Sequence, residues 1–139
     1  MSDTMNGRGH CLCGEVSFDV PNINKSVGAC HCSMCRNWCG GPLMAVECGS
    51  DVTFKGQQNI SVYNSSEWAE RGFCNKCGSH LFYRLKEQQL HFLPYGLFEN
   101  QEQFEFDHQV FIDKKPSTYS FANDTRNETE AEVFAKYEQ

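Results

Sequence analysis

Seven of the nine cysteines in this 139-residue sequence lie in three short groups. The groups read Cys11-Leu12-Cys13-Gly14, Cys30-His31-Cys32-Ser33-Met34-Cys35 and Cys74-Asn75-Lys76-Cys77-Gly78. Two thiolates separated by one or two residues can bind the same Zn²⁺, because a tight turn or an extended segment points both sulfurs at one ion. A disulfide across so short a loop would be strained. The spacing therefore predicts metal ligands, and it leaves Cys39 and Cys48 outside the groups.

The first and last groups together predict a structural metal site. A four-thiolate zinc site is closed to other ligands and contributes directly to folding. Its ligands here would be Cys11, Cys13, Cys74 and Cys77, which would join two distant segments of the chain. A thioredoxin-like redox pair is the alternative for the last two. We favour metal, because the residues from Ser79 onward alternate like a strand, whereas the redox motif leads into a helix.

The middle group predicts a second site of a different kind. Cys30, Cys32 and Cys35 would hold a metal with three thiolates and leave its fourth position to water or a ligand, which is typical of a catalytic metal. Alternatively, Cys39 supplies a fourth ligand and leaves a purely structural protein. Coordination chemistry favours the open site. His31 lies between two ligands and should point away from the ion, either beside the site or to the surface.

Short strands must position these groups. Residues 14–20 alternate apolar and polar side chains, and Pro21 should end that strand. Further strands are expected at Leu43 to Glu47, Val52 to Phe54, Ile60 to Tyr63, Ser79 to Leu85, Leu90 to Leu93 and Gln109 to Ile112. Regularly spaced short strands without helical patterns between them are typical of antiparallel sheets.

Helical pattern is scarce. A short helix or turn is expected within residues 127–137, with Thr129 as its cap, and Pro116 to Asn127 should be an exposed loop. We therefore predict a mainly β fold, a single zinc-stabilised domain of antiparallel sheets over residues 1–139. Its core would span about residues 7–115, followed by a tail at residues 116–139.

The overall composition narrows the class of protein. Eighteen acidic against twelve basic side chains give a formal charge of -6, which disfavours binding to nucleic acid. No apolar run has the length of a signal peptide or a membrane span. We therefore expect a cytoplasmic, reducing compartment and no membrane partner, and there clustered cysteines are more often metal ligands or reactive thiols than disulfides.

The order of these groups resembles the glutathione-dependent formaldehyde-activating enzyme family, also described as the centromere-protein-V/formaldehyde-activating domain. The resemblance is carried by Gly9-His10-Cys11-Leu12-Cys13-Gly14-Glu15-Val16, Cys30-His31-Cys32-Ser33-Met34-Cys35-Arg36, Arg71-Gly72-Phe73-Cys74-Asn75-Lys76-Cys77-Gly78-Ser79-His80-Leu81 and, more weakly, His108-Gln109-Val110-Phe111-Ile112-Asp113 with Lys115-Pro116. It implies an Mss4-like fold and two Zn²⁺ per chain on the ligand sets described above. Asn37 and Gly96-Leu97-Phe98 depart from the family's founding pattern, so no glutathione-contacting residue is carried over.

The resemblance also implies a reaction, the reversible addition of glutathione to formaldehyde by a carbon-sulfur lyase. A zinc ion with three thiolates is a weak Lewis acid and suits activation of a soft thiol. We therefore expect a small thiol, glutathione or similar, to add to formaldehyde or another small aldehyde at Cys30, Cys32 and Cys35. Arg36 would either attract a substrate carboxylate or form a surface salt bridge.

The sequence also allows two rival functions. One is a zinc-stabilised binding module that catalyses nothing. The other is a redox switch that uses Cys39 or Cys48, which would need thiols that react quickly in the zinc-loaded protein.

Overall fold

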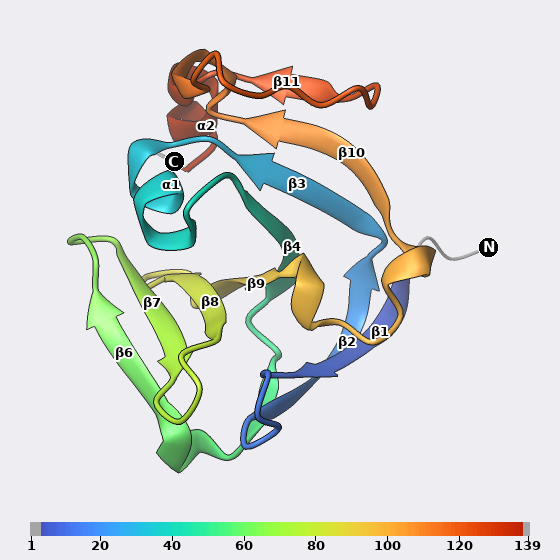
Figure 1. The fold of residues 1–139 in the computed structure, drawn as a ribbon, viewed down its shortest axis with the longest axis vertical. Coiled ribbons are helices and arrows are strands. Elements are labelled where there is room, and N and C mark those ends of the chain that lie inside the picture. The colour runs from blue at the N-terminus through green and yellow to red at the C-terminus, as the bar shows by residue number, and fades with distance from the viewer. Residues whose placement is uncertain (1–3, 138–139) are drawn as a thin grey trace. The chain divides into compact units, whose positions relative to one another are not determined.

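Short β-strands make up most of the fold, seen in a computed structural model that describes residues 4–137 (Figure 1). The contacts within the chain divide it into two compact units. Among the described residues, unit 1 comprises residues 4–25 and 46–104, and unit 2 comprises residues 26–45 and 105–137. The fold is mainly β, as predicted, while the single domain and its limits stay a prediction.

Unit 1 contains two antiparallel arrangements of strands. One sheet has the strand order β1-β2-β5. The other arrangement has the order β9-β8-β7-β6, with the end of β4 beside β9. The strands are β1 (Thr4–His10), β2 (Ser17–Asn24), β4 (Leu43–Gly49, in this unit from Val46), β5 (Thr53–Lys55), β6 (Ile60–Asn64), β7 (Ala69–Cys74), β8 (His80–Leu85) and β9 (Leu90–Pro94). Three short 3₁₀ turns, η1 (Gln57–Asn59), η2 (Tyr95–Leu97) and η3 (Gln101–Gln103), complete the unit.

The alternation in β2 builds the core of unit 1. Phe18 and Val20 are buried, and the Phe18 ring packs edge-on against Phe98 with centroids 5.0 Å apart. Pro21 does not end the strand, contrary to the prediction, because it lies where the pairing of β2 with β1 shifts register, between Val20 opposite Gly7 and Ile23 opposite Met5. Proline is tolerated at such an irregularity, where the regular ladder of hydrogen bonds is interrupted.

Unit 2 holds a smaller set of strands and both helices. β10 lies between β3 and β11 and pairs with each of them in parallel, whereas β3 pairs with the start of β4 in antiparallel register (Figure 1). The elements are β3 (Ser26–Cys30), α1 (Ser33–Cys39), the start of β4, β10 (Glu105–Val110), η4 (Ile112–Lys114), β11 (Arg126–Glu128) and α2 (Glu130–Tyr137).

The structure contains all the predicted strands and the predicted terminal helix, with shifted limits, and it contains several further strands and one further helix. The last expected strand, residues 109–112, instead ends at Val110, because Phe111 adopts a left-handed backbone with φ 56° and a 3₁₀ turn follows. The terminal helix is confirmed as α2. Thr129 caps it through its hydroxyl, which accepts from the Glu132 N–H at 3.2 Å. Helix α1 and strands β1, β3, β7 and β11 were not predicted.

Candidate metal centres

Four cysteine sulfurs of unit 1 lie within 4.8 Å of one another. They belong to Cys11, Cys13, Cys74 and Cys77, the set predicted for a structural site. Cys13 Sγ lies 3.6 Å from Cys11 Sγ and 3.8 Å from Cys74 Sγ. Sulfurs bound to one tetrahedral zinc at about 2.3 Å would be about 3.8 Å apart. The arrangement therefore fits a tetrahedral metal ion.

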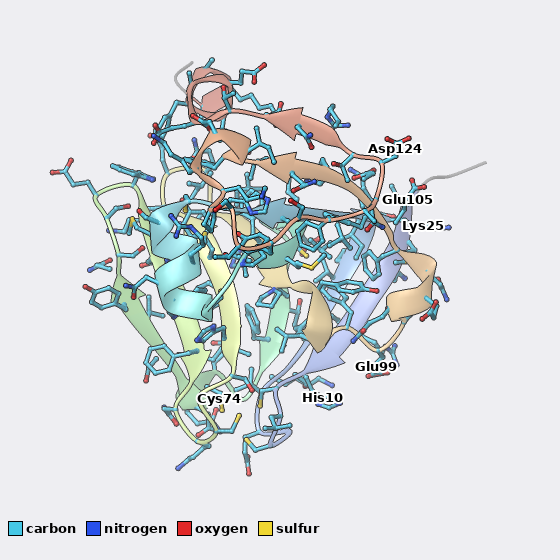
Figure 2. The ribbon with its side chains drawn as sticks, turned by 45° about the horizontal axis from the view of Figure 1, so that its top comes forward. His10, Lys25, Cys74, Glu99, Glu105 and Asp124 are labelled. Atoms are coloured by element: carbon cyan, nitrogen blue, oxygen red, sulfur yellow. The ribbon has the colours of Figure 1, made fainter. Side chains whose placement is uncertain are left out.

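Two similar turns present these sulfurs, one after β1 and one after β7. In the first, the Cys11 N–H donates to Val16 O at 2.9 Å; in the second, the Cys74 N–H donates to Ser79 O at 2.9 Å. Gly14 and Gly78 follow the second cysteine of each pair with φ 83° and 80°, a backbone that favours glycine. Figure 2 marks His10 and Cys74 at the ends of their strands, where the turns begin.

The first pair therefore sits in a turn and not in the extended segment expected from its Cys-x-Cys spacing. The physical reason is the closing hydrogen bond from Cys11 to Val16, which folds the chain back before β2 begins at Ser17. Val16 is fully buried although it precedes the strand.

Ser79 connects the two turns. Its Oγ accepts from the Leu12 N–H at 3.0 Å, which leaves the hydroxyl hydrogen for Cys77 Sγ at 3.2 Å. This hydroxyl, together with hydrogen bonds from the Ser79 backbone and from Cys13, lowers the pKa of Cys77 to about 5. Backbone N–H groups of Val16 and Lys76 also donate to cluster sulfurs, each at 3.4 Å. Such donors stabilise thiolates, the form that binds metal. Sequence reasoning missed Ser79, although it directly follows the Cys-x-x-Cys-Gly motif.

Three further sulfurs gather in unit 2, at the junction of β3 and α1. Those of Cys30, Cys32 and Cys35 lie within 4.8 Å of one another. Cys30 ends β3, Cys32 caps α1, and the Cys35 N–H donates to Cys32 Sγ at 3.3 Å. The nearby sulfurs of Cys32 and Cys35 raise the pKa of Cys30, because three crowded thiols cannot all ionise without a cation. The donor set therefore fits a metal ion here as well.

The two remaining cysteines are members of neither cluster. Cys39 is the last residue of α1, and its sulfur is not among the three that gather at the helix start. Cys48 is buried in β4, where burial raises its pKa to about 12 and its Sγ donates to Val46 O at 3.4 Å. A thiol in that state reacts slowly.

His31 points away from the second cluster, as expected, but it is buried and does not reach the surface. It is 0% exposed, and its Nδ1 and Nε2 lie 2.8 Å from Tyr119 Oη and Gln109 Oε1. Burial lowers the pKa of His31, so its ring is neutral near pH 7. Sequence reasoning missed Gln109 and Tyr119 as partners, although Gln109 belongs to the weak motif at residues 108–113.

Arg36 lies on α1 beside an open groove of about 800 Å³ within unit 2. Its Nε donates to His31 O at 2.9 Å. The ion pairs recorded among residues 4–137 do not include Arg36, which weakens the salt-bridge interpretation. The groove is lined by Ser33, Arg36, Asn37, the turn at residues 40–42, and residues 116 and 118–121.

The segment expected as an exposed loop, residues 116–127, lines the other side of this groove with residues 116 and 118–121. Its Tyr119 and Phe121 side chains are half-buried, and β11 begins at Arg126. The segment has no helix or strand before Arg126 and most of its side chains are exposed, which agrees with the prediction. Tyr119 and Phe121 are less exposed because their rings pack within unit 2; the Phe121 ring lies 4.9 Å from that of Phe106.

Comparison with known proteins places the chain in a family. A protein-family model described as glutathione-dependent formaldehyde-activating enzyme matches residues 6–114. An uncharacterised lyase of Schizosaccharomyces pombe is 37% identical over 126 residues, which cover 90% of this chain and 92% of that protein. A Halomonas elongata protein provisionally named glutathione-dependent formaldehyde-activating enzyme is 31% identical over 83 residues, 53% of each chain. The chain therefore belongs to the glutathione-dependent formaldehyde-activating enzyme family.

The likeness extends to a solved fold. A crystal structure of a Rhodobacter sphaeroides protein matches with a TM-score of 0.59 at 24% identity, over 71% of this chain and 96% of that one. The predicted fold class is confirmed: the protein is mainly β, with two cysteine clusters consistent with zinc sites, and its family has an Mss4-like fold. Among the described residues, no helix is long and apolar enough to cross a membrane.

Proposed function

We propose that this protein is a carbon-sulfur lyase that binds two Zn²⁺ per chain. One ion would be structural and held by Cys11, Cys13, Cys74 and Cys77, whose sulfur spacings of 3.6 and 3.8 Å support a tetrahedral site. The other would be held by Cys30, Cys32 and Cys35 and would keep its fourth position for a substrate.

The proposed reaction is the reversible addition of a thiol, glutathione or similar, to formaldehyde or another small aldehyde. The sulfur forms a bond to the carbonyl carbon, the carbonyl π bond breaks, and the thiol proton ends on the new hydroxyl group. Zinc at the second site would supply thiol activation and polarisation of the aldehyde oxygen. The chain itself would bind and orient the thiol in the groove, where Arg36 lies ready to attract a substrate carboxylate.

One observation supports this function above the others. Three sulfurs gather at the start of α1, the helix whose Ser33 and Arg36 line the groove, and the sulfur of Cys39 is not among them. A metal position with three sulfur ligands and one open place suits catalysis, whereas a fourth sulfur would close the site. The comparisons add that relatives carry the names of a lyase and of the family's enzyme.

The cellular setting of the proposal follows from the cysteines. Seven thiols remain available as metal ligands only where they stay reduced, so we place the protein in the cytoplasm. A formal charge of -6 makes nucleic acid an unsuitable partner, and the expected partners are the small thiol and the small aldehyde.

The test combines metal analysis with turnover. We expect two zinc ions per chain by mass spectrometry of the native protein and by elemental analysis, and aldehyde consumption that depends on an added thiol. Glutathione, cysteine and 2-mercaptoethanol should each be tried with formaldehyde. A protein that binds both ions and consumes no aldehyde with any of these thiols would instead be the zinc-stabilised binding module.

A further inference from the structure

We propose that His31 and Tyr119 form a positioning pair that holds both walls of the groove in place. The kinetic part of this inference rests on the proposed function, whereas its structural part does not. The pair joins residues 88 positions apart in the sequence, and neither residue belongs to a cysteine cluster.

The hydrogen bonds around His31 form a chain with one direction. Thr125 Oγ1 donates to Asn127 Oδ1 at 2.7 Å and accepts from Gln109 Nε2 at 2.8 Å. Gln109 therefore presents its Oε1 to His31 Nε2, which must carry the ring hydrogen. His31 Nδ1 is left as an acceptor, so the Tyr119 hydroxyl donates to it. Every polar atom of the imidazole is satisfied, and the tautomer is fixed.

The main chain of His31 completes the arrangement. Its N–H donates to Val110 O at 3.2 Å, and its carbonyl accepts from Arg36 Nε at 2.9 Å. Arg36 lines the groove on the side of α1, and Tyr119 lines it on the side of residues 116–121. One residue therefore bonds to side chains of both walls, and it sits between two cysteines of the second cluster.

The other hydrogen bonds of this segment do not reach the cysteine motif, although the Phe121 ring lies 6.2 Å from the ring of His31. Lys115 Nζ, directly before the segment, donates to Tyr119 O, to Pro116 O at 3.0 Å and to Ser120 Oγ at 3.2 Å. Phe121 packs on Phe106 of β10. The hydrogen bond from the Tyr119 hydroxyl joins this segment to His31. Removing it should loosen the wall without disturbing the cysteines.

Two substitutions at position 31 distinguish the roles of the two ring nitrogens of His31. His31→Asn keeps an acceptor near the place of Nδ1, so it can retain the bond from Tyr119. His31→Gln keeps a donor near the place of Nε2, so it can retain the bond to Gln109 but loses the one from Tyr119. Tyr119→Phe removes the same bond from the other side, and Tyr95→Phe is the matched control because it also removes a part-buried 2.8 Å bond, to Gln101 O.

Hydrogen exchange tests the structural part with the zinc-loaded full-length protein. In Tyr119→Phe and His31→Gln, the amides of residues 117–121 should exchange at least about five times faster than in the native protein, the factor expected for one lost hydrogen bond. His31→Asn should stay closer to native, and Tyr95→Phe should leave this segment unchanged. Equal exchange in Tyr119→Phe and Tyr95→Phe would overturn the proposal.

Steady-state kinetics with glutathione and formaldehyde test the positioning role. Tyr119→Phe and His31→Gln should raise KM for the thiol about fivefold, with kcat within about twofold and both zinc ions retained. A fall in kcat of about 100-fold in both position-31 variants at unchanged KM would assign His31 to proton transfer and overturn positioning. If the native protein has no turnover, the proposed function fails, and the exchange experiment still decides whether the pair holds the wall.

Discussion

The two cysteine clusters are built in opposite ways. The four-sulfur cluster brings together two similar turns from distant parts of unit 1, and Ser79 cross-links them. The three-sulfur cluster lies within six consecutive residues at a strand-to-helix junction of unit 2. A metal ion in the first cluster would therefore link segments that are far apart in the sequence, with Cys13 and Cys74 separated by 61 positions. A metal ion in the second would link only neighbouring residues. If each cluster binds the proposed zinc ion, this difference predicts that loss of the first ion unfolds the protein and that loss of the second abolishes only the proposed reaction.

The largest effect is expected from Cys74→Ser. Cys74 is fully buried in the four-sulfur cluster, and structural zinc contributes about 10 kcal/mol or more in zinc-finger peptides. Because a whole domain is stable by only about 5–15 kcal/mol, this variant should lose its cooperative unfolding transition. Circular dichroism on heating and zinc content measure this loss. A variant that melts within a few degrees of the native protein would show that the first site does not support the fold.

A smaller structural effect and a large catalytic one are expected from Cys35→Ser. This variant should keep one zinc ion and lose at least about 100-fold in thiol-dependent aldehyde consumption, because the second site loses a ligand. Its unfolding midpoint should move by only a few degrees.

The matched control for this prediction is Cys39→Ser, on the same short helix. It should keep both ions and nearly full activity. Release of one ion from Cys39→Ser would show that Cys39 closes the second site, and the contrast between a closed and an open cluster would then fail.

The cysteine sets could be predicted because their signal is local and chemical. Thiolates one or two residues apart restrict their partners, and the strand alternation at Phe18 and Val20 identifies the buried face without knowledge of the fold. These signals do not depend on the rest of the chain, which explains why both clusters are found with the predicted members.

The features that the sequence did not predict depend on weak local signals or on contacts between residues far apart in the sequence. Helix α1 has seven residues, two of them cysteines, so its propensity signal is weak, and Cys32 as a cap becomes visible only in the structure. The hydrogen bond between His31 and Tyr119 spans 88 positions, and no sequence pattern around either residue predicts it. Ser79 is an intermediate case, since its place directly after the Cys-x-x-Cys-Gly motif could have drawn attention to its hydroxyl.

Ser79→Ala tests whether the hydroxyl that links the two turns supports metal binding at the four-sulfur cluster alone. This variant removes the hydroxyl that joins Leu12 to Cys77, and loss of a partner of a metal ligand typically weakens binding about 10–100-fold. We expect weaker zinc binding at the four-sulfur cluster only, measured by competition with a chelator, and unchanged turnover while both ions are bound. Ser66→Ala is the control, because it also removes a hydroxyl that accepts a backbone N–H in unit 1, away from the cluster. Equal zinc affinity in both variants would contradict the role of Ser79.

The smallest effect concerns substrate charge at the open cluster. Arg36 lines the groove and forms no recorded ion pair among the described residues, so its charge is available to a ligand. Arg36→Gln should raise KM for glutathione about 5- to 10-fold and leave KM for the uncharged 2-mercaptoethanol nearly unchanged, because only the former presents carboxylates. Arg36→Lys keeps the charge and should show a smaller change. If KM rises equally for both thiols, Arg36 acts through its bond to His31 O, as part of the groove wall, and carries no preference for acidic thiols.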